Sequence, residues 1–274
     1  LYVIMGYYPS HFVAIDASFQ SATQTAFLAG INAYKDHPAV LMWALGNEQN
    51  LDNGQHPNWY PFVNTAAGAA KAADPDHPVM TVEGECPQCG TPIAWNVGDV
   101  GRSANDASMP NLDIWGFTAY RGKSFNGGFA TLAAATSKPL LLAEFGKDAF
   151  KDSTQSEDSA MQSRYLIDQW TEISQNLSAS NATNPLVGAA WFEWSDEWWK
   201  ADHSNPSNTC NQHNSPVQFT RAGDTDDPDY NEEWFGLTSI RPIDAISNPS
   251  GTARTLRTSY TTLQTLWGGS GGAI

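Results

Sequence analysis

The stretch Val40-Leu-Met-Trp-Ala-Leu-Gly-Asn-Glu48 decides the fold, because it is an apolar run that ends abruptly in an amide and a carboxylate. A run that is apolar at every position, rather than at alternate positions, is typical of a parallel strand covered on both faces. Polar residues directly after such a strand lie at the carboxyl edge of its sheet, where α/β proteins place their functional groups. Asn47 and Glu48 are therefore the first candidates for a functional site.

Similar apolar runs recur along the chain and predict a repeated strand–helix unit. The runs begin at spacings of 39, 35, 25 and 48 residues, counted from Val40 through Val79, Ile114, Pro139 and Val187. Such spacings are typical of βα units. The six expected strands are Leu1–Tyr7, Val40–Gly46, Pro78–Val82, Leu112–Tyr120, Pro139–Glu144 and Leu186–Trp194.

Helical patterns fill the gaps between these strands. Asp16 is a good N-cap for a helix that ends before Pro38, and further helices are predicted over Trp59–Ala73, Ser156–Leu177 and Thr252–Trp267. The stretch between Ser195 and Ser250 is rich in Asn, Asp, Pro and Ser, and a loop of this length is usually functional or disordered.

Repeated βα units leave two architectures open, a doubly wound sheet or a barrel. No Gly-rich phosphate-binding turn follows any strand, which weakens the case for the nucleotide-binding sheet. Polar residues gather instead at the strand ends, as in the active site of a barrel. They are Asn47-Glu48, Glu83-Gly-Glu85, Tyr120-Arg121, Glu144 and Glu193 to Glu197. We therefore predict an α/β fold of the TIM-type (β/α) barrel class.

The composition excludes several classes of partner. The net charge of −15 argues against nucleic acid and anionic membrane surfaces, since both need a basic face. No run of 18 apolar residues exists, so no segment is predicted to span a membrane. Abundant aromatic residues, with 16% charged residues, are common in secreted enzymes that act on neutral polymers. We therefore expect a secreted or extracellular protein, although the chain carries no signal peptide.

Two carboxylates at strand ends are the strongest candidates for chemistry. Glu48 follows one apolar strand and Glu144 follows Pro139-Leu-Leu-Leu-Ala143. Burial and like-charge neighbours can keep one carboxyl protonated near neutral pH while the other stays ionised. Cleavage of a glycosidic bond needs such a pair, one group to protonate the leaving oxygen and one to act as nucleophile. The structural alternative is that each Glu caps a helix or pairs with Arg102 or Arg121.

Four ordered segments resemble the large clan of retaining (β/α)8-barrel glycoside hydrolases, which includes cellulases, mannanases, β-galactosidases and β-1,3-glucan-active enzymes. Asp36 to Glu48 resembles the clan's fourth strand and Leu112 to Tyr120 its sixth. Lys138 to Gly146 resembles the seventh and Gly188 to Glu197 the eighth. The resemblance extends over residues 1–267 and starts at the third strand, so the expected barrel is incomplete, with about six βα units, the third to the eighth.

The resemblance also implies roles for individual residues. Glu48 would be the acid/base and Glu144 the nucleophile, their carboxyl groups about 5–5.5 Å apart as retention of configuration requires. Tyr120 would orient the nucleophile and Asn47 would contact the sugar. Trp194 would form the floor of the subsite, and Trp198 is a further substrate-binding candidate. In this clan an early strand supplies a basic residue that supports the nucleophile, and no residue here can be assigned to that position.

A barrel without its first two units would leave open edges, which full closure removes. We therefore expect a homo-oligomer joined through the open barrel edges, or a plug formed by another segment. The expected domains are a catalytic barrel over residues 1–267 and a flexible Gly/Ser tail over residues 268–274.

Two further motifs leave alternatives open. Cys86-Pro-Gln-Cys89 and Cys210-Asn-Gln-His213 are weak candidates for a zinc site, and a Cys86–Cys89 disulfide or free thiols are the other interpretations. The acidic run from Asp224 to Tyr230 is interpreted as a solvated loop, with a calcium site as the alternative.

The sequence thus predicts a retaining glycosidase, a hydrolase or transglycosylase that cleaves β-linked neutral glycans, above all a β-glucan. The substrate is an oligo- or polysaccharide, and no cofactor is implied because two carboxyl groups and water suffice. The alternative is a weakly active or inactive carbohydrate-binding or scaffold barrel. A Ser hydrolase on an open sheet is disfavoured because G-x-S-x-G is absent from the sequence.

Overall fold

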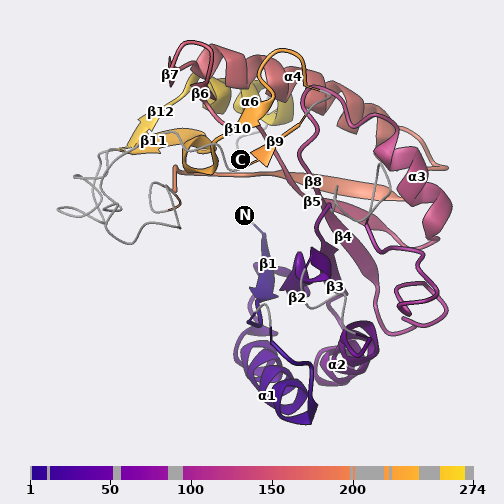
Figure 1. Ribbon diagram of the computed structural model, residues 1–274. Helices are drawn as coiled ribbons and strands as arrows, with labels where there is room; N and C mark the ends of the chain where they lie inside the picture. The colour runs from indigo at the N-terminus through magenta and orange to yellow at the C-terminus, as the bar shows by residue number, and fades with distance from the viewer. Residues whose placement is uncertain are drawn as a thin grey trace. The chain divides into compact units, whose positions relative to one another are not determined.

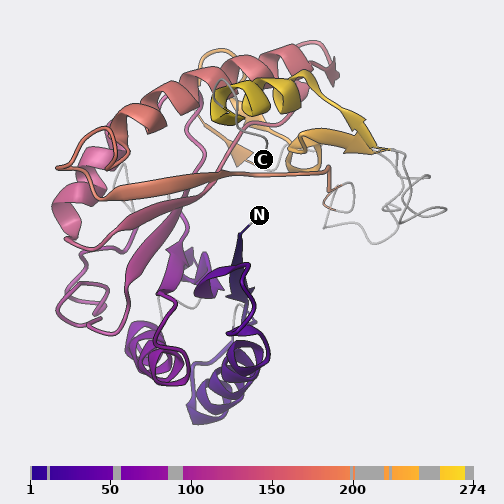
Figure 2. The same ribbon diagram turned by 180° about the vertical axis from the view of Figure 1, so that it is seen from behind.

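The structure is a computed structural model that describes residues 2–10, 13–51, 57–85, 95–197, 200, 219–221, 224–240 and 254–268 (Figures 1 and 2). The strands of its main sheet are β1 (Val3–Tyr7), β2 (Val40–Asn47), β3 (Val79–Glu83), β4 (Ile114–Ala119), β5 (Leu140–Phe145) and β8 (Leu186–Trp191). The helices are α1 (Ala17–Tyr34), α2 (Trp59–Ala73), α3 (Gly128–Ala135), α4 (Ser159–Asn176) and α6 (Thr258–Gly268), with 3-10 turns η1 (Gln49–Leu51) and η5 (Glu232–Trp234).

Within the described residues, the main sheet has six strands in the order β1-β2-β3-β4-β5-β8, which is their order along the chain. The first four strands pair in parallel, with Gly6 opposite Ala44 and Met80 opposite Ile114. Helices follow β1, β2 and β5, as the helical patterns predict, and a further helix, which was not predicted, follows β4. The expected α/β architecture on a parallel sheet is confirmed.

Three short antiparallel pairs extend this framework. They are β6 (Phe150–Lys151) with β7 (Ser156–Glu157), β9 (Phe219–Thr220) with β10 (Asp229–Tyr230), and β11 (Thr238–Ile240) with β12 (Arg254–Leu256). They correct two predicted helix starts. Ser156 pairs in β7, so α4 begins at Ser159, and Arg254 pairs in β12, so α6 begins at Thr258.

The last strand of the sheet is also shorter than predicted. We expected a strand over Leu186–Trp194, but β8 ends at Trp191. Beyond it the backbone pairs with a different segment, because the Leu237 amide donates to the Glu193 carbonyl and the Thr238 amide donates to the Trp194 carbonyl, at 2.8 and 3.0 Å.

The chain divides into two compact units. Unit 1 comprises Leu1–Ala119, Gly127–Ala143 and Asn176–Ala189, and unit 2 comprises Tyr120–Asn126, Glu144–Gln175 and Ala190–Ile274. Each unit has a core of its own. A single catalytic domain over residues 1–267 stays a prediction.

In unit 1, both faces of the sheet are covered. Alternate strand residues form one apolar cluster, made of Met42, Ala44, Met80, Val82, Ile114 and Leu141. On the other face α1 and α2 lie side by side along β1, β2 and β3 (Figure 1). Asp16 caps α1 as predicted, since its Oδ1 accepts the Phe19 amide at 2.9 Å.

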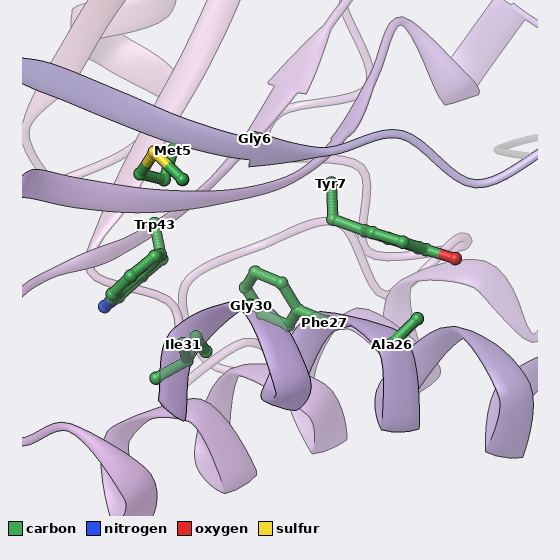
Figure 3. Close-up of a pocket in the computed structure, with 8 residues that line it drawn as sticks. All are labelled: Met5, Gly6, Tyr7, Ala26, Phe27, Gly30, Ile31 and Trp43. Carbon is green, nitrogen blue, oxygen red and sulfur yellow. The ribbon is translucent and has the colours of Figure 1, made fainter. Parts of the chain in front are cut away.

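A small apolar pocket lies where α1 packs against β1 and β2 (Figure 3). Met5 and Tyr7 line it from β1 and Trp43 from β2, and Phe27 and Ile31 line it from α1. It contains no carboxylate or other ionisable acid, so it belongs to the packing of helix on sheet rather than to the candidate site.

The core of unit 2 is aromatic and also contains buried charges. Lys147 is fully buried, and its ammonium lies 3.8 Å from the centre of the Tyr230 ring. Arg257 is 3% exposed and forms a double ion pair with Asp196, which is 1% exposed. No described helix is long and apolar enough to cross a membrane.

Candidate active site

The first candidate carboxylate, Glu48, lies in unit 1 directly after β2. Its backbone has φ +55, a left-handed conformation that is uncommon for residues other than glycine. The Glu48 amide donates to the Val82 carbonyl at 2.9 Å, and its carbonyl accepts the Leu51 amide at 3.0 Å. The chain thus turns from β2 into η1 at this residue, and the turn fixes the backbone that carries the carboxyl group.

The Glu48 side chain meets a hydroxyl group on the same sheet. Thr118 of β4 donates from Oγ1 to Glu48 Oε1, and Thr118 is 1% exposed. Glu48 itself and the preceding Asn47 are half-buried. Thr118 thus holds one oxygen of a half-buried carboxyl group.

Glu83, the last residue of β3, contacts helix α2. It is fully buried, and its Oε2 accepts from the Tyr60 hydroxyl of α2 at 2.8 Å. Burial raises the pKa of Glu83 to about 7, outweighing the opposing effect of the Tyr60 hydrogen bond. Glu83 therefore joins sheet to helix, and it does not line a cleft as its place at a strand end suggests.

Glu83→Gln is expected to change how stability depends on pH. The folded-state pKa lies above the usual value of 4.5, so the native state binds this proton more tightly and stability falls as pH rises from about 4.5 to 7. Glutamine does not titrate, so the variant lacks this loss. Between pH 4.5 and 8 the free energy of unfolding of the variant therefore rises relative to that of the parent by up to about 3 kcal/mol. Urea unfolding at several pH values measures the difference, and a difference independent of pH would contradict the expectation.

The second candidate carboxylate, Glu144, lies in unit 2 at the end of β5. The Tyr120 hydroxyl donates to Glu144 Oε2 at 2.7 Å, and both residues are half-buried. This contact is the one that the expected role of Tyr120 requires, and the role itself stays a prediction. Two residues later Gly146 allows a close approach of the chain, because a Cβ there would lie 2.4 Å from the Phe192 carbonyl oxygen.

Aromatic rings fix the position of Tyr120. The ring centres of Phe192, Phe219 and Phe235 lie 6.3, 5.9 and 5.4 Å from that of Tyr120. Arg221 donates from Nε to the Tyr120 carbonyl at 2.8 Å. A hydroxyl on a ring held in this way donates to Glu144 from a preorganised position, which stabilises the ionised carboxylate.

The segment after β8 presents a carboxyl group and an exposed ring. Burial, and then the neighbouring Glu197 carboxylate, raise the pKa of Glu193 to about 9. Trp194 is 56% exposed, and its ring packs edge-on against Tyr260 of α6 at 5.7 Å. An exposed indole can stack on a sugar ring, so the geometry of Trp194 is compatible with the predicted role.

The acidic run from Asp224 to Tyr230 is only partly the solvated loop that we expected, because Asp224, Asp227 and Tyr230 are buried while Thr225 and Asp226 are exposed. The Tyr165 hydroxyl donates to Asp224 Oδ1 at 2.6 Å. The Lys147 ammonium lies 2.8 Å from Asp227 Oδ2 and donates to the carbonyls of Asp227 and Asp229. A lysine thus binds the oxygens for which a calcium ion was considered, and no group of metal-binding side chains was found among the described residues.

Several predicted residues lie outside the described residues, namely Trp198, Cys86, Cys89, Cys210 and His213. Other residues were not predicted. Thr118, Lys147 and Arg221 each act through a partner distant in sequence, and no local pattern marks such residues.

Comparison with known proteins identifies a family and several similar proteins. Residues 7–210 match the family described as "Glycosyl hydrolases family 2, TIM barrel domain". The chain is 23% identical over 184 residues to mannan endo-1,4-beta-mannosidase F of Aspergillus fumigatus, a match that covers 62% of this chain and 42% of that protein. The chain spans less than half the length of the curated relatives it matches.

Solved structures share the fold at low sequence identity. A β-galacturonidase from Eisenbergiella tayi gives a TM-score of 0.57 at 12% identity, covering 95% of this chain and 38% of that one. A β-glucuronidase from Dictyoglomus thermophilum gives 0.53 at 14% identity, covering 93% and 36%. The predicted fold class, a TIM-type barrel with six of its eight strands, is confirmed for the described residues.

Proposed function

The chain belongs to the glycosyl hydrolases family 2 TIM barrel domain family, and from this premise we propose that it cleaves β-linked neutral glycans with retention of configuration. Glu144 is the nucleophile and Glu48 the acid/base. The observation that carries the proposal is the 2.7 Å hydrogen bond from the Tyr120 hydroxyl to Glu144 Oε2. A preorganised donor keeps a carboxylate ionised for attack and stabilises the charge that returns to it when the intermediate breaks down.

The proposed reaction has two steps. Glu144 attacks the anomeric carbon while Glu48 gives its proton to the leaving oxygen, and a covalent glycosyl-enzyme forms. Glu48, now a base, then removes a proton from water. The water oxygen attacks the anomeric carbon, the bond from that carbon to Glu144 breaks, and the sugar is released. The chemistry requires both carboxyl groups to reach one glycosidic bond.

The net charge of the chain and the mannosidase name of its curated relatives support a neutral substrate. A net charge of −15 repels uronate polymers at long range. The mannosidase name of a relative makes β-1,4-mannan a substrate to test beside the β-glucans that the sequence favours. Asn47 and the exposed Trp194 are the proposed sugar contacts in the described residues, and Trp198 remains a predicted one.

The test combines a substrate panel with trapping of the intermediate. The protein is incubated with β-glucans, β-mannan and a β-glucuronide, and the products are identified by mass spectrometry. A 2-deoxy-2-fluoro glycoside of the preferred sugar then traps the glycosyl-enzyme, and peptide mapping is expected to place the added mass on Glu144. A label on another residue, or hydrolysis that inverts the anomeric centre, would overturn the assignment.

A binding role without turnover is the second candidate. The observation in its favour is the exposed Trp194 ring in the segment that follows β8. Calorimetry with mannan and glucan oligosaccharides separates the two functions, because a binding protein retains the oligosaccharide intact. Binding together with unchanged oligosaccharide after prolonged incubation would favour this second function.

The open edge of the sheet supports the proposed association of copies. Within the described sheet β1 has a single neighbour, β2, and its edge exposes Tyr2, Val3 and Ile4 by 70, 40 and 37%. Apolar strand edges of this kind tend to pair. Light scattering of the purified chain tests the proposal, and a monomer at high concentration counts against it. Secretion likewise stays a prediction from composition.

A further inference from the structure

Three neighbouring strands contribute to the surroundings of the Glu48 side chain. Glu48 follows β2, while Gly84 directly follows β3 and Thr118 lies near the end of β4, and all three belong to unit 1. Its backbone is held by hydrogen bonds to Val82 and Leu51. The freedom that remains lies in the side-chain torsions, so the atoms around the side chain decide where the carboxyl group points.

Gly84 forms one wall of this site. A Cβ at Gly84 would lie 2.9 Å from Glu48 Cβ and 3.0 Å from Glu48 Cγ, distances too short for any other residue unless something shifts. Gly84 is itself held in place by the fully buried Asn50. The Gly84 amide donates to Asn50 Oδ1 and Asn50 Nδ2 donates to the Gly84 carbonyl, both at 2.6 Å.

Thr118 forms the second contact. Its hydroxyl donates to Glu48 Oε1, and its own carbonyl accepts Nε1 of Trp95 at 3.0 Å. Trp95 packs edge-on against Phe117, with ring centres 5.3 Å apart. The hydroxyl is thus presented by a strand residue whose surroundings are packed, and it is directed at one oxygen of the carboxyl group.

We propose that Thr118 and Gly84 are positioning residues that hold the carboxyl group of Glu48 and set the pH at which it releases its proton. The proposal rests on the proposed function of Glu48 as acid/base. A hydroxyl that donates to a carboxylate favours its ionised form, so Thr118 makes Glu48 a readier proton donor and a weaker base. Gly84 keeps the side chain from turning out of reach of Thr118.

The first test compares Thr118→Val with Thr118→Ser. Valine keeps the shape of the threonine side chain and removes the hydroxyl donor. Because Glu48 then releases its proton at higher pH, the descending limb of the plot of kcat/KM against pH moves to higher pH by about 0.5–1 unit. We expect kcat/KM on an oligosaccharide, whose leaving group needs protonation, to fall about tenfold, a part of what general acid catalysis contributes. On a dinitrophenyl glycoside, whose leaving group departs unprotonated, the loss is less than about twofold. Serine restores both rates and profile.

The matched control is Thr81→Val. Thr81 is also fully buried on the sheet of unit 1, and its hydroxyl donates to the Leu45 carbonyl rather than to a carboxyl group. This variant removes a buried hydroxyl and leaves the pH profile unchanged. Gly84→Ala provides an independent second variant and shifts the profile in the direction of Thr118→Val. A Thr118→Val profile identical to that of the parent overturns the proposal.

A spectroscopic measurement separates this inference from the proposed function. Carbon NMR of protein labelled at the Glu carboxyl carbon follows the titration of Glu48, with Glu48→Gln identifying its signal. Its titration midpoint moves upward in Thr118→Val if the hydroxyl holds the carboxylate, whether or not the protein turns over a glycan. A moved midpoint in a protein that cleaves no substrate rejects the proposed function and retains the positioning role. An unmoved midpoint rejects the positioning role alone.

Discussion

Glu144→Gln is expected to lower kcat on the preferred neutral glycan by at least about 10⁴-fold, because an amide cannot form the covalent intermediate. The amide oxygen still accepts from the Tyr120 hydroxyl, so the local geometry of unit 2 is preserved. Substrate binding therefore changes little while turnover is lost. Initial rates over the substrate panel measure kcat, and calorimetry on oligosaccharides measures the retained affinity.

Two further variants serve as a control and as a comparison for Glu144→Gln. Glu172→Gln is the matched control, since Glu172 is another carboxylate of unit 2 that accepts the Phe125 amide at 2.9 Å, and it leaves kcat within about twofold of the parent. Tyr120→Phe removes the donor and keeps the nucleophile, with an expected loss of about 10²-fold. Full activity in Glu144→Gln would show that the nucleophile is misassigned.

Arg257→Met is expected to destabilise the protein by about 3–5 kcal/mol, because it leaves a buried carboxylate without its counter-charge. Arg257 Nη2 donates to Asp196 Oδ2 at 2.8 Å, and Nη1 donates to the Gly236 carbonyl at 2.7 Å. Nε donates to Glu157 Oε1 at 2.7 Å. The guanidinium thus joins the residue that directly follows β12 to the segment after β8 and to β7. Urea unfolding at neutral pH measures the loss.

Arg254→Met is the matched control for this prediction. Arg254 lies on β12, three residues before Arg257, but it is exposed, and the structure gives its Nε a hydrogen bond to Ser195 Oγ at 3.3 Å. Its replacement is expected to change stability by less than about 0.5 kcal/mol. The double variant Arg257→Met/Asp196→Leu removes both charges and recovers much of the lost stability. Equal effects of the two single Arg variants would contradict the argument.

The sequence predicts those elements whose signal is local. β2 and β5 are recognised because their residues are apolar without interruption, and α1 because Asp16 can cap it. The hydrogen bond between Tyr120 and Glu144 follows from a resemblance in which four segments keep their order. In the strands and the helix, the residues that determine the element lie within a few positions of one another, so the element can be predicted from a short segment of sequence.

The elements that were missed depend on partners far along the chain. β8 is shorter than predicted because Leu237 and Thr238 compete for its backbone. Helix α3 was not predicted, since it is short and begins after Gly127, which has φ +78 rather than a side-chain cap. In the sequence, Thr118 has no feature that distinguishes it from other strand residues, and its role depends on its contact with Glu48. Lys147 likewise resembles a surface lysine in the sequence, and its burial depends on its contact with Asp227.

Lys147 has a consequence for how unit 2 responds to its surroundings. Its ammonium donates to two backbone carbonyls and forms ion pairs with Asp148 Oδ2 and Asp227 Oδ2, at 3.2 and 2.8 Å. A cation carried by the chain is always present in a one-to-one ratio and cannot be diluted away or stripped by a chelator. The buried contacts of the segment from Asp224 to Tyr230 therefore form together with the fold, because the cation that holds them is part of the chain.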